Sequence, residues 1–353
     1  MATIPTPSLF PNVPIQRGTP ANSLPPNSAA GLSGIARLAA DSPLADAKRG
    51  VEYFQIPVRS ILNHCDSERV PFKLTINPYR GCEFGCVYCY ARYTHEYMEL
   101  DGSEFERKIY AKANAGPIVS RDLAREDVIG EHIAIGTATD PYQPAEREFG
   151  VTREILEKFA LREGLQFSIT TKSNQVTRDI DLLQRISERS AVSVNVTIVT
   201  PRTRLARLLE PRAPRPDLRF DAVRALREAG IRAGVFVMPV LPGLTDREED
   251  LETLAREAKR ADALWLVGGA LHLMPAPKRV FFPFIEQKFP RLAARYRQWY
   301  GRAAYAPEKY RGEVSEIFRR LREKYELGTR PSAPMRRPAV GQMDLPLEMI
   351  EYA

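Results

Sequence analysis

Residues 81–90 read Gly81-Cys82-Glu83-Phe84-Gly85-Cys86-Val87-Tyr88-Cys89-Tyr90, with three cysteines in the spacing Cys-x3-Cys-x2-Cys. Three thiolates on one short loop are soft sulfur ligands, which suit iron–sulfur clusters better than any other metal site. A cubane with four irons takes four ligands, so Cys82, Cys86 and Cys89 would leave one iron without a protein ligand. The spacing therefore predicts a [4Fe–4S] cluster with one iron open to a small molecule.

The composition is that of a globular protein with a basic balance. The chain has 353 residues, of which 44% are hydrophobic and 27% charged. The net charge of +7 favours polyanions such as nucleic acid, although many enzymes with neutral substrates are equally basic. The clustered cysteines form no disulfide framework and indicate a reducing compartment, so we expect a cytoplasmic protein. No apolar stretch is long enough for a membrane span, and the N-terminus shows no secretory signal.

Proline divides the chain into two tails and a central region. Residues 1–50 and 331–353 are rich in proline and poor in apolar surface, so we expect both tails to be disordered. Residues 51–280 alternate apolar, β-branched runs with helical periods, as in an α/β domain. Residues 281–330 mix aromatic and basic side chains, and we expect helices there that close the end of the sheet.

The central region contains six candidate strands, most of them followed by a helical stretch. The strands are Phe72–Asn77, His132–Thr137, Gln166–Thr171, Val192–Val199, Gly234–Val240 and Ala263–Val267. Helical periods cover 152–164, 180–186, 221–230 and 246–258. This alternation predicts a parallel sheet with right-handed crossovers. Asp140 and Lys172 directly follow strands, where barrel enzymes place their sites, which favours a partial barrel over a doubly wound sheet.

The cysteine loop resembles the signature of the radical S-adenosylmethionine (SAM) enzymes, in which an aromatic residue, here Tyr88, precedes the third cysteine. The resemblance implies a partial (βα)6 TIM-like barrel whose first strand leads into the loop. It also implies that Cys82, Cys86 and Cys89 bind a [4Fe–4S] cluster and that SAM chelates the open iron. In the family, an electron from the cluster cleaves SAM to a 5′-deoxyadenosyl radical, which abstracts hydrogen from a substrate. A reductant such as flavodoxin or ferredoxin is then a partner.

Further runs resemble the branch that contains spore photoproduct lyase and its bacterial relatives. They are Asn77-Pro78-Tyr79-Arg80-Gly81-Cys82, Tyr90-Ala91-Arg92, Thr139-Asp140-Pro141-Tyr142-Gln143-Pro144, Thr171-Lys172-Ser173, Glu210-Pro211-Arg212 and Val240-Leu241-Pro242-Gly243. This branch makes nucleic acid the leading hypothesis for the substrate, with DNA repair as one candidate reaction. Residues 133–142 contain no cysteine where the lyase has its hydrogen donor, so the resemblance does not carry over that exact activity.

The resemblance also implies residues for the SAM pocket. Lys172 corresponds to a family lysine near the SAM carboxylate, with a solvated surface lysine as the alternative. Tyr88 would pack near the adenine, and Gly136 and Thr137 lie where the second strand approaches the methionine. Asp140 and Gln143 either hold the SAM amino group, hold the substrate, or cap the next turn.

Other polar residues have two interpretations each. Ser193 and Asn195 alternate with valines on the fourth strand, and they contact ribose or methionine or form hydrogen bonds between strands. Glu210 and Arg212 either pair with each other or bind substrate.

The alternative metal site is a structural zinc ion held by the three cysteines with His95 or Cys65. Structural zinc sites usually combine two Cys-x2-Cys halves, and no second half exists in the sequence.

The C-terminal stretch Gln342-Met343-Asp344-Leu345-Pro346-Leu347 resembles the hexapeptide by which bacterial DNA-handling proteins bind the sliding clamp. An extended peptide of this kind can bury two leucines in a groove while the glutamine makes polar contacts. The sequence therefore predicts a radical SAM enzyme that acts on nucleic acid. The alternatives are modification of RNA or protein by the same radical, and a zinc-stabilised, non-catalytic adaptor that binds DNA and the clamp.

Overall fold

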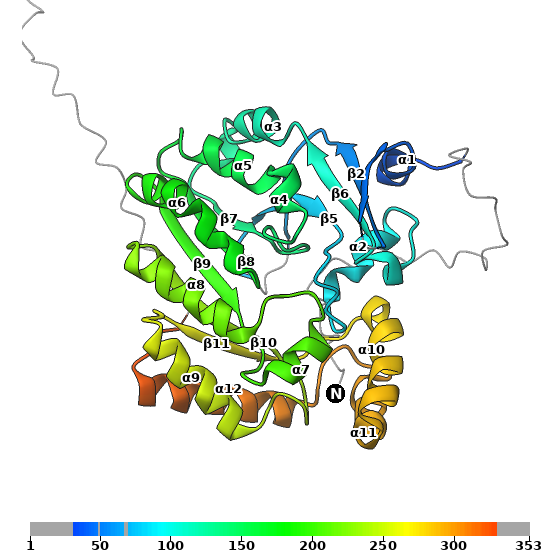
Figure 1. The fold of residues 1–353 in the computed structure, drawn as a ribbon, viewed down its shortest axis with the longest axis vertical. Helices are drawn as coiled ribbons and strands as arrows, with labels where there is room; N and C mark the ends of the chain where they lie inside the picture. The colour runs from blue at the N-terminus through cyan, green and yellow to red at the C-terminus, as the bar shows by residue number, and fades with distance from the viewer. Residues whose placement is uncertain (1–30, 49, 67–69, 330–353) are drawn as a thin grey trace, which may run out of the picture.

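The computed structural model describes residues 31–48, 50–66 and 70–329. Within these residues a seven-stranded sheet forms the middle of the fold, in the order β11-β10-β9-β8-β7-β4-β3 (Figure 1). Its strands are β3 (Leu62–His64), β4 (Leu74–Ile76), β7 (His132–Ile135), β8 (Gln166–Thr171), β9 (Ala191–Thr197), β10 (Arg232–Val240) and β11 (Leu266–Ala270). All neighbours from β4 to β11 pair in parallel, and β3 pairs antiparallel with β4. In the described chain the edge strands β3 and β11 do not pair, so the predicted partial barrel is confirmed as an open parallel sheet.

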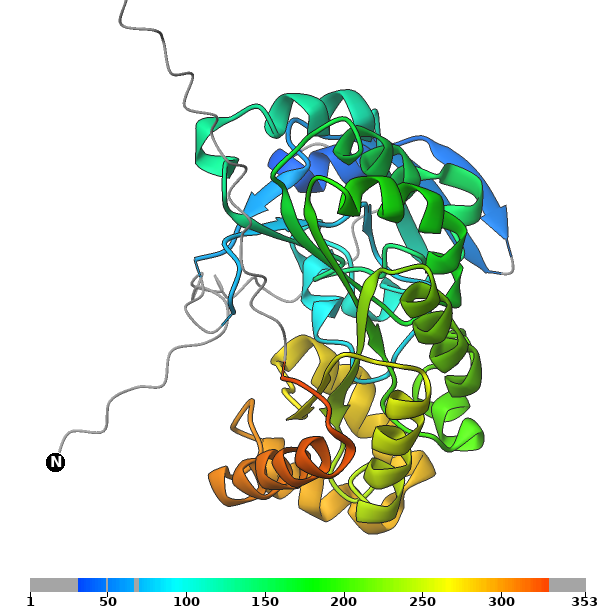
Figure 2. The ribbon, with the colours of Figure 1, turned by 90° about the vertical axis from the view of Figure 1, so that its left-hand side faces the viewer.

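The crossovers between the parallel strands are helices that bury one apolar face against the sheet. In α5, Ile155, Leu156 and Phe159 recur at helical spacing and are fully buried. Figure 2 shows the crossover helices coloured green along one side of the sheet. The helical elements between β4 and β11 are η1 (Tyr90–Arg92), α2 (Tyr93–Glu96), η2 (Gly102–Glu104), α3 (Ala115–Asp122), η3 (Glu126–Val128), α4 (Glu146–Phe149), α5 (Val151–Phe159), η4 (Asn174–Asp179), α6 (Ile180–Ser187), α7 (Thr203–Leu209), α8 (Pro216–Glu228) and α9 (Glu248–Arg260).

The last strand lies further along the chain than predicted. β11 spans Leu266–Ala270, whereas the apolar run predicted a strand at Ala263–Val267. Two glycines in β11 lower its strand propensity, but one of them has a packing role. A Cβ at Gly268 would lie 2.1 Å from the ring of Phe318, so the missing side chain lets helix α12 (Glu308–Tyr325) pack on this strand.

A second sheet was not predicted from the sequence. Its order is β1-β2-β6-β5, formed by β1 (Leu44–Lys48), β2 (Val51–Pro57), β6 (Lys108–Ala113) and β5 (Tyr79–Arg80). Helix α1 (Gly34–Ala40) precedes β1 and buries Ala36 and Ala39. The prediction of disorder for residues 1–50 is therefore wrong for 34–48, because β2 offers β1 a backbone partner and α1 an apolar surface. Residues 1–30 and 330–353, including the predicted clamp peptide Gln342–Leu347, lie outside the described residues.

The C-terminal helices begin at Pro275, slightly before the predicted boundary at residue 281. They are α10 (Pro275–Lys288), α11 (Pro290–Tyr300) and α12. Helix α12 covers β11, whereas α10 packs against η1 and η2 (Figure 1). None of the helices in the described ranges is long and apolar enough to cross a membrane.

Candidate functional site

The cysteine loop leaves the short strand β5 at Gly81 and ends at Cys89, directly before η1. Cys82 and Cys86 are buried and Cys89 is half-buried. Gly81 has a φ of +82°, and a Cβ there would lie 2.6 Å from a backbone carbonyl of β6, so only glycine fits this position. The loop thus follows the first parallel strand, as the sequence predicted, and its side chains belong to a buried apolar cluster with residues that follow the later strands.

The segment that follows β7 holds the first half of the loop. Gln143 is fully buried; its side-chain oxygen accepts from the N–H of Glu83 at 2.9 Å, and its nitrogen donates to the carbonyl of Gly81 at 3.1 Å. The Thr139 hydroxyl donates to the same carbonyl at 2.6 Å. The Glu83 carboxylate accepts from the N–H of Ala145 at 2.7 Å. These bonds satisfy polar groups that a buried loop would leave unpaired, so they fix its path.

Two further contacts hold the second half of the loop. The N–H of Val87 donates to the carbonyl of Leu209 at the end of α7, at 3.0 Å. The buried guanidinium of Arg92 donates to the carbonyl of Cys86 at 3.2 Å and pairs with Glu106 at 2.6 Å. The loop is therefore anchored on both sides before any ligand binds.

A buried charge network lies beside the cysteines. Glu210, at the end of α7, accepts a hydrogen bond from the Tyr88 hydroxyl and pairs with Arg219 of α8 at 2.6 Å. The Lys172 ammonium lies 4.0 Å from the Glu210 carboxylate and 5.9 Å from the centre of the Tyr88 ring. Two cations thus share one buried carboxylate, which leaves a net positive charge near Cys86.

The network keeps its groups charged despite burial. Burial alone would raise the pKa of Glu210, but Arg219 and Lys172 hold the pKa of this carboxyl below its usual value. Burial alone would lower the pKa of Lys172, yet the Glu210 carboxylate, and Cys86 when it is a thiolate, raise the pKa of Lys172 above its usual value. Lys172 therefore presents a cation beside the cysteine loop at neutral pH.

A comparison with protein families agrees with this geometry. The model of the Radical SAM superfamily matches residues 76–256, more than half of the chain. The chain belongs to the radical SAM superfamily. The matched range begins in β4, contains the cysteine loop and ends in α9. The resemblance expected from the cysteine spacing is confirmed.

Relatives of this radical SAM protein include an uncharacterized protein of Mycobacterium tuberculosis, 34% identical over 289 residues, which cover 81% of this chain and 85% of that protein. An uncharacterized protein of Methanocaldococcus jannaschii is 34% identical over 179 residues, or 50% of this chain and 63% of that protein.

Among solved structures, a spore photoproduct lyase mutant superposes with a TM-score of 0.60 at 19% identity, covering 86% of this chain and 85% of the lyase. The lyase complexed with dinucleoside spore photoproduct gives 0.59 at 18% identity, covering 84% of each chain. At these identities the likeness shows a shared fold.

Membership of the superfamily implies a [4Fe–4S] cluster and SAM, and the donor set of this radical SAM protein fits the cluster. Burial raises the pKa of Cys86 to about 12, so a thiolate there requires compensating positive charge such as iron supplies. In the described residues, no three His, Cys, Asp or Glu side chains converge on one metal ion. A cubane requires no such convergence because each cysteine binds a different iron. The arrangement gives no support to a single zinc ion.

Neither candidate for a fourth zinc ligand is placed for that role. The His95 ring is buried, hydrogen-bonded through Nε2 to the carbonyl of Lys108 at 3.0 Å and packed edge-on against Phe105. Its burial lowers the pKa of His95 to about 4. Cys65 follows β3 and lines a cavity together with Tyr90, and it joins no group of metal-binding side chains in the described residues. His95 therefore has a packing role.

Asp140 ties two strand ends together. Its carboxylate accepts from the N–H of Tyr142 at 2.9 Å, from the Thr171 hydroxyl at 2.7 Å and from the N–H of Lys172 at 2.7 Å. These bonds fit the turn-capping alternative and also fix the backbone of Lys172. A contact between Asp140 and SAM stays a prediction.

Asn195 joins neighbouring strands inside the barrel. Its amide nitrogen donates to Thr170 of β8 at 3.3 Å, and its oxygen accepts from the indole N–H of Trp265 at 3.1 Å. The inter-strand interpretation therefore describes Asn195. Ser193 lies two residues earlier on the same face of β9 and is half-buried. Contacts of both residues with ribose or methionine stay predictions.

Gly136 and Thr137 lie at the end of β7, next to the cysteine loop. Gly136 has a φ of +88°, and a Cβ there would lie 2.5 Å from the carbonyl of Thr170, so glycine is required for β7 to approach β8. The Thr137 side chain hydrogen-bonds with Asn77 at 3.1 Å, and its carbonyl accepts from the Tyr90 hydroxyl. Their predicted approach to the methionine of SAM is not tested by these contacts.

The two residues Glu210 and Arg212 do not pair with each other. Glu210 pairs with Arg219, whereas the Arg212 guanidinium donates to the carbonyl of Glu106 at 3.2 Å. Sequence reasoning missed Arg219, whose side chain is 1% exposed. The available signal was an arginine beside Phe220 on the apolar face of α8, where an unpaired charge would be costly.

Proposed function

We propose that this protein is a radical SAM enzyme that acts on nucleic acid, with photoproduct-lyase-like DNA repair as the leading hypothesis. In this proposal Cys82, Cys86 and Cys89 each bind one iron of a [4Fe–4S] cluster, and SAM binds the fourth iron. One observation carries the proposal: two buried thiols and one half-buried thiol lie on a loop that is anchored on both sides and faces the Lys172 cation. When bound, the cluster supplies the electron that cleaves SAM to a hydrogen-abstracting 5′-deoxyadenosyl radical.

The residues of the chain bind and orient the reactants. Lys172 provides a cation for the SAM carboxylate, and Glu210 keeps that cation in place. The Tyr88 ring, fixed by its hydroxyl bond to Glu210, offers an apolar face for the adenine. Burial of the loop excludes water from the site, which protects a reactive radical from side reactions.

Nucleic acid is favoured as substrate by three observations. The chain has a net charge of +7. Its sequence motifs resemble the spore photoproduct lyase branch, and the lyase that shares its fold is known in complex with a dinucleoside photoproduct. The C-terminal peptide Gln342–Leu347 resembles a clamp-binding motif, which would bring the enzyme to DNA.

The test is anaerobic reconstitution with iron and sulfide, followed by reduction in the presence of SAM. We expect iron binding and release of 5′-deoxyadenosine, both abolished in Cys86→Ala. Cys65→Ala is the matched control, because it removes the thiol outside the motif and should leave the iron content unchanged. Stoichiometric zinc without iron-dependent turnover would refute the enzyme and support the non-catalytic adaptor. If SAM is cleaved, turnover of damaged DNA, RNA and protein separates the repair hypothesis from modification of RNA or protein.

A further inference from the structure

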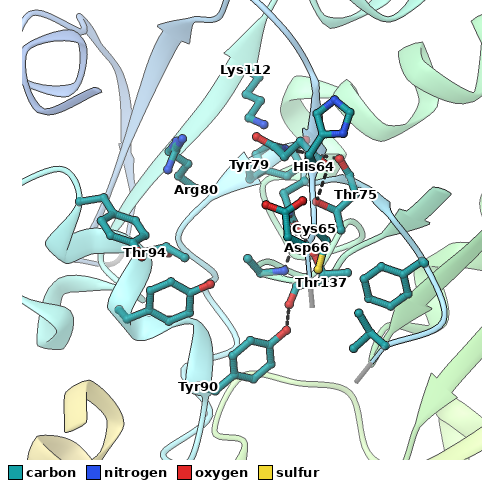
Figure 3. Close-up of a pocket in the computed structure, with 17 residues that line it drawn as sticks. His64, Cys65, Asp66, Thr75, Tyr79, Arg80, Tyr90, Thr94, Lys112 and Thr137 are labelled. Carbon is teal, nitrogen blue, oxygen red and sulfur yellow. Dashed lines mark hydrogen bonds between the residues drawn. The ribbon is translucent and has the colours of Figure 1, made fainter. Parts of the chain in front are cut away.

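A cavity of about 370 Å³ opens beside the cysteine loop (Figure 3). Both ends of the loop border it: Arg80 lies two residues before Cys82, and Tyr90 directly follows Cys89. The volume lies within the range of pockets that hold small molecules. A group bound in this cavity would lie next to the segment that carries the proposed cluster.

Two cations line the inner part of the cavity, Arg80 from β5 and Lys112 from β6. Arg80 pairs with Tyr110 in the antiparallel register, and Lys112 is two residues further on. Side chains two residues apart point to the same face of a strand, so the two cations are diagonal neighbours on one face. Figure 3 shows both side chains at the cavity.

Neither cation has a carboxylate partner within ion-pair distance among the described residues. Lys112 is only 4% exposed, and the buried Nε of Arg80 has no hydrogen-bond partner there. Asp122 is the acidic group whose charge acts on Lys112, but it already accepts from Ser60 and from the N–H of Ile61, at 2.8 and 2.7 Å.

Leaving the buried Lys112 and the half-buried Arg80 uncompensated is costly for the fold. A buried charge is normally paired, because its lost hydration has to be replaced. Burial and the charge of Arg80 lower the pKa of Lys112 to about 7. Asp66 lines the cavity as well, but its side chain is exposed and forms no ion pair with either cation. Within the described part of the chain this arrangement lacks a counter-charge, which an anionic group of a ligand would supply.

The remaining walls indicate what kind of anion it is. Phe72, Tyr90, Tyr93 and Tyr97 line the cavity, together with the amides of Asn63 and Asn77. Aromatic rings beside cations form the usual recognition surface for single nucleotides, where rings stack on bases and cations hold phosphates.

We propose that this cavity binds one nucleotide unit of the substrate, with Arg80 and Lys112 holding its phosphate and the tyrosines contacting its base. The proposal rests on the proposed action on nucleic acid and adds the position of the substrate. It places the anchored nucleotide beside the cysteine loop, within the region where the radical would react. DNA is the favoured source of this nucleotide because of the spore photoproduct lyase resemblance.

The experiment measures binding of a fluorescein-labelled, single-stranded oligothymidylate to the full-length protein by anisotropy, at several salt concentrations. For single strands, each phosphate contact contributes about 0.7 to the slope of log K against log salt. We expect Lys112→Met and Arg80→Gln each to reduce this slope by about 0.7 and to weaken binding about tenfold. Lys259→Met, which removes an exposed cation of α9, is the matched control for net charge. Lys112→Arg should retain the slope if charge, rather than folding, is responsible.

The outcomes separate this inference from the proposed function. Slopes and affinities equal to those of Lys259→Met would overturn the phosphate site, and so would a loss that Lys112→Arg shares. Competition by an acidic peptide as strong as that by oligothymidylate would overturn the nucleotide assignment, whereas preference for oligouridylate would identify RNA as the source. SAM cleavage by the unsubstituted protein is measured separately. Its absence would refute the proposed function while the slopes still decide the phosphate site.

Discussion

Lys112 makes the stability of the fold depend on pH. Burial, and then the charge of Arg80, lower its pKa from 10.5 to about 7, against the opposing charge of Asp122. Between pH 7 and 10 the unfolded chain therefore holds a proton that the folded protein has lost, so the free energy of unfolding rises with pH. From pH 7 to pH 9 this single lysine contributes an increase of about 2 kcal/mol. Below about pH 6 both states are protonated, and the contribution no longer changes.

Lys112→Met keeps the apolar stem and removes the titration. We expect the difference in unfolding free energy between wild type and variant to change by about 2 kcal/mol between pH 7 and 9. Urea unfolding of the cluster-free, reduced protein at pH 7, 8 and 9 measures this difference, and all other titrating groups cancel. Lys73→Met is the matched control, because the side chain of Lys73 is 74% exposed. Parallel stability curves for wild type and Lys112→Met would refute the reasoning.

Three other substitutions test the packing of the site. Gly136→Ala should lower the free energy of unfolding in urea by about 3 kcal/mol, because the new Cβ would lie 2.5 Å from a backbone carbonyl. The control Gly150→Ala also has a positive φ, but its Cβ enters open space, so it should lower the free energy of unfolding by about 1 kcal/mol. Equal losses in the two variants would contradict this reasoning. Gln143→Leu removes the hydrogen bonds that fix the cysteine loop, so the variant should retain less iron after reconstitution. Gln184→Leu, at an exposed position, is the control. Equal iron content in the two variants would show that the Gln143 bonds are dispensable. Glu210→Gln removes the carboxylate that the buried Arg219 and the half-buried Lys172 share. It should destabilise the fold by about 3–5 kcal/mol, so an unchanged urea midpoint would argue against the buried Glu210–Arg219 pair.

The parallel sheet could be predicted because its signal is local. Each long central strand, such as β9, is a short β-branched run followed by a helical period. The second sheet has no such signal. β6 reads Lys-Ile-Tyr-Ala-Lys-Ala, and its buried Lys112 interrupts the apolar pattern. Its partners β2 and β5 are distant in sequence, so only tertiary pairing reveals that these short runs are strands.

The cysteine loop could also be predicted, because its three metal ligands lie within one short run of the sequence and their spacing can be read there directly. The structure places Lys172 beside Tyr88 of that loop, whereas the contacts of both residues with SAM stay predictions. Arg219 and the pair Arg80–Lys112 could not be foreseen, since their significance lies in burial and in missing or shared counter-charges. Those properties arise from packing between elements that are far apart along the chain.

The central claim is that three cysteines hold a cluster with one iron free for SAM. Electron paramagnetic resonance of the reconstituted, reduced protein, recorded with and without SAM, tests it most directly. The account predicts the signal of a reduced [4Fe–4S] cluster whose g-values shift when SAM is added, because the open iron gains new ligands. A cluster signal that SAM leaves unchanged, or a cluster that forms equally well in Cys86→Ala, would contradict it.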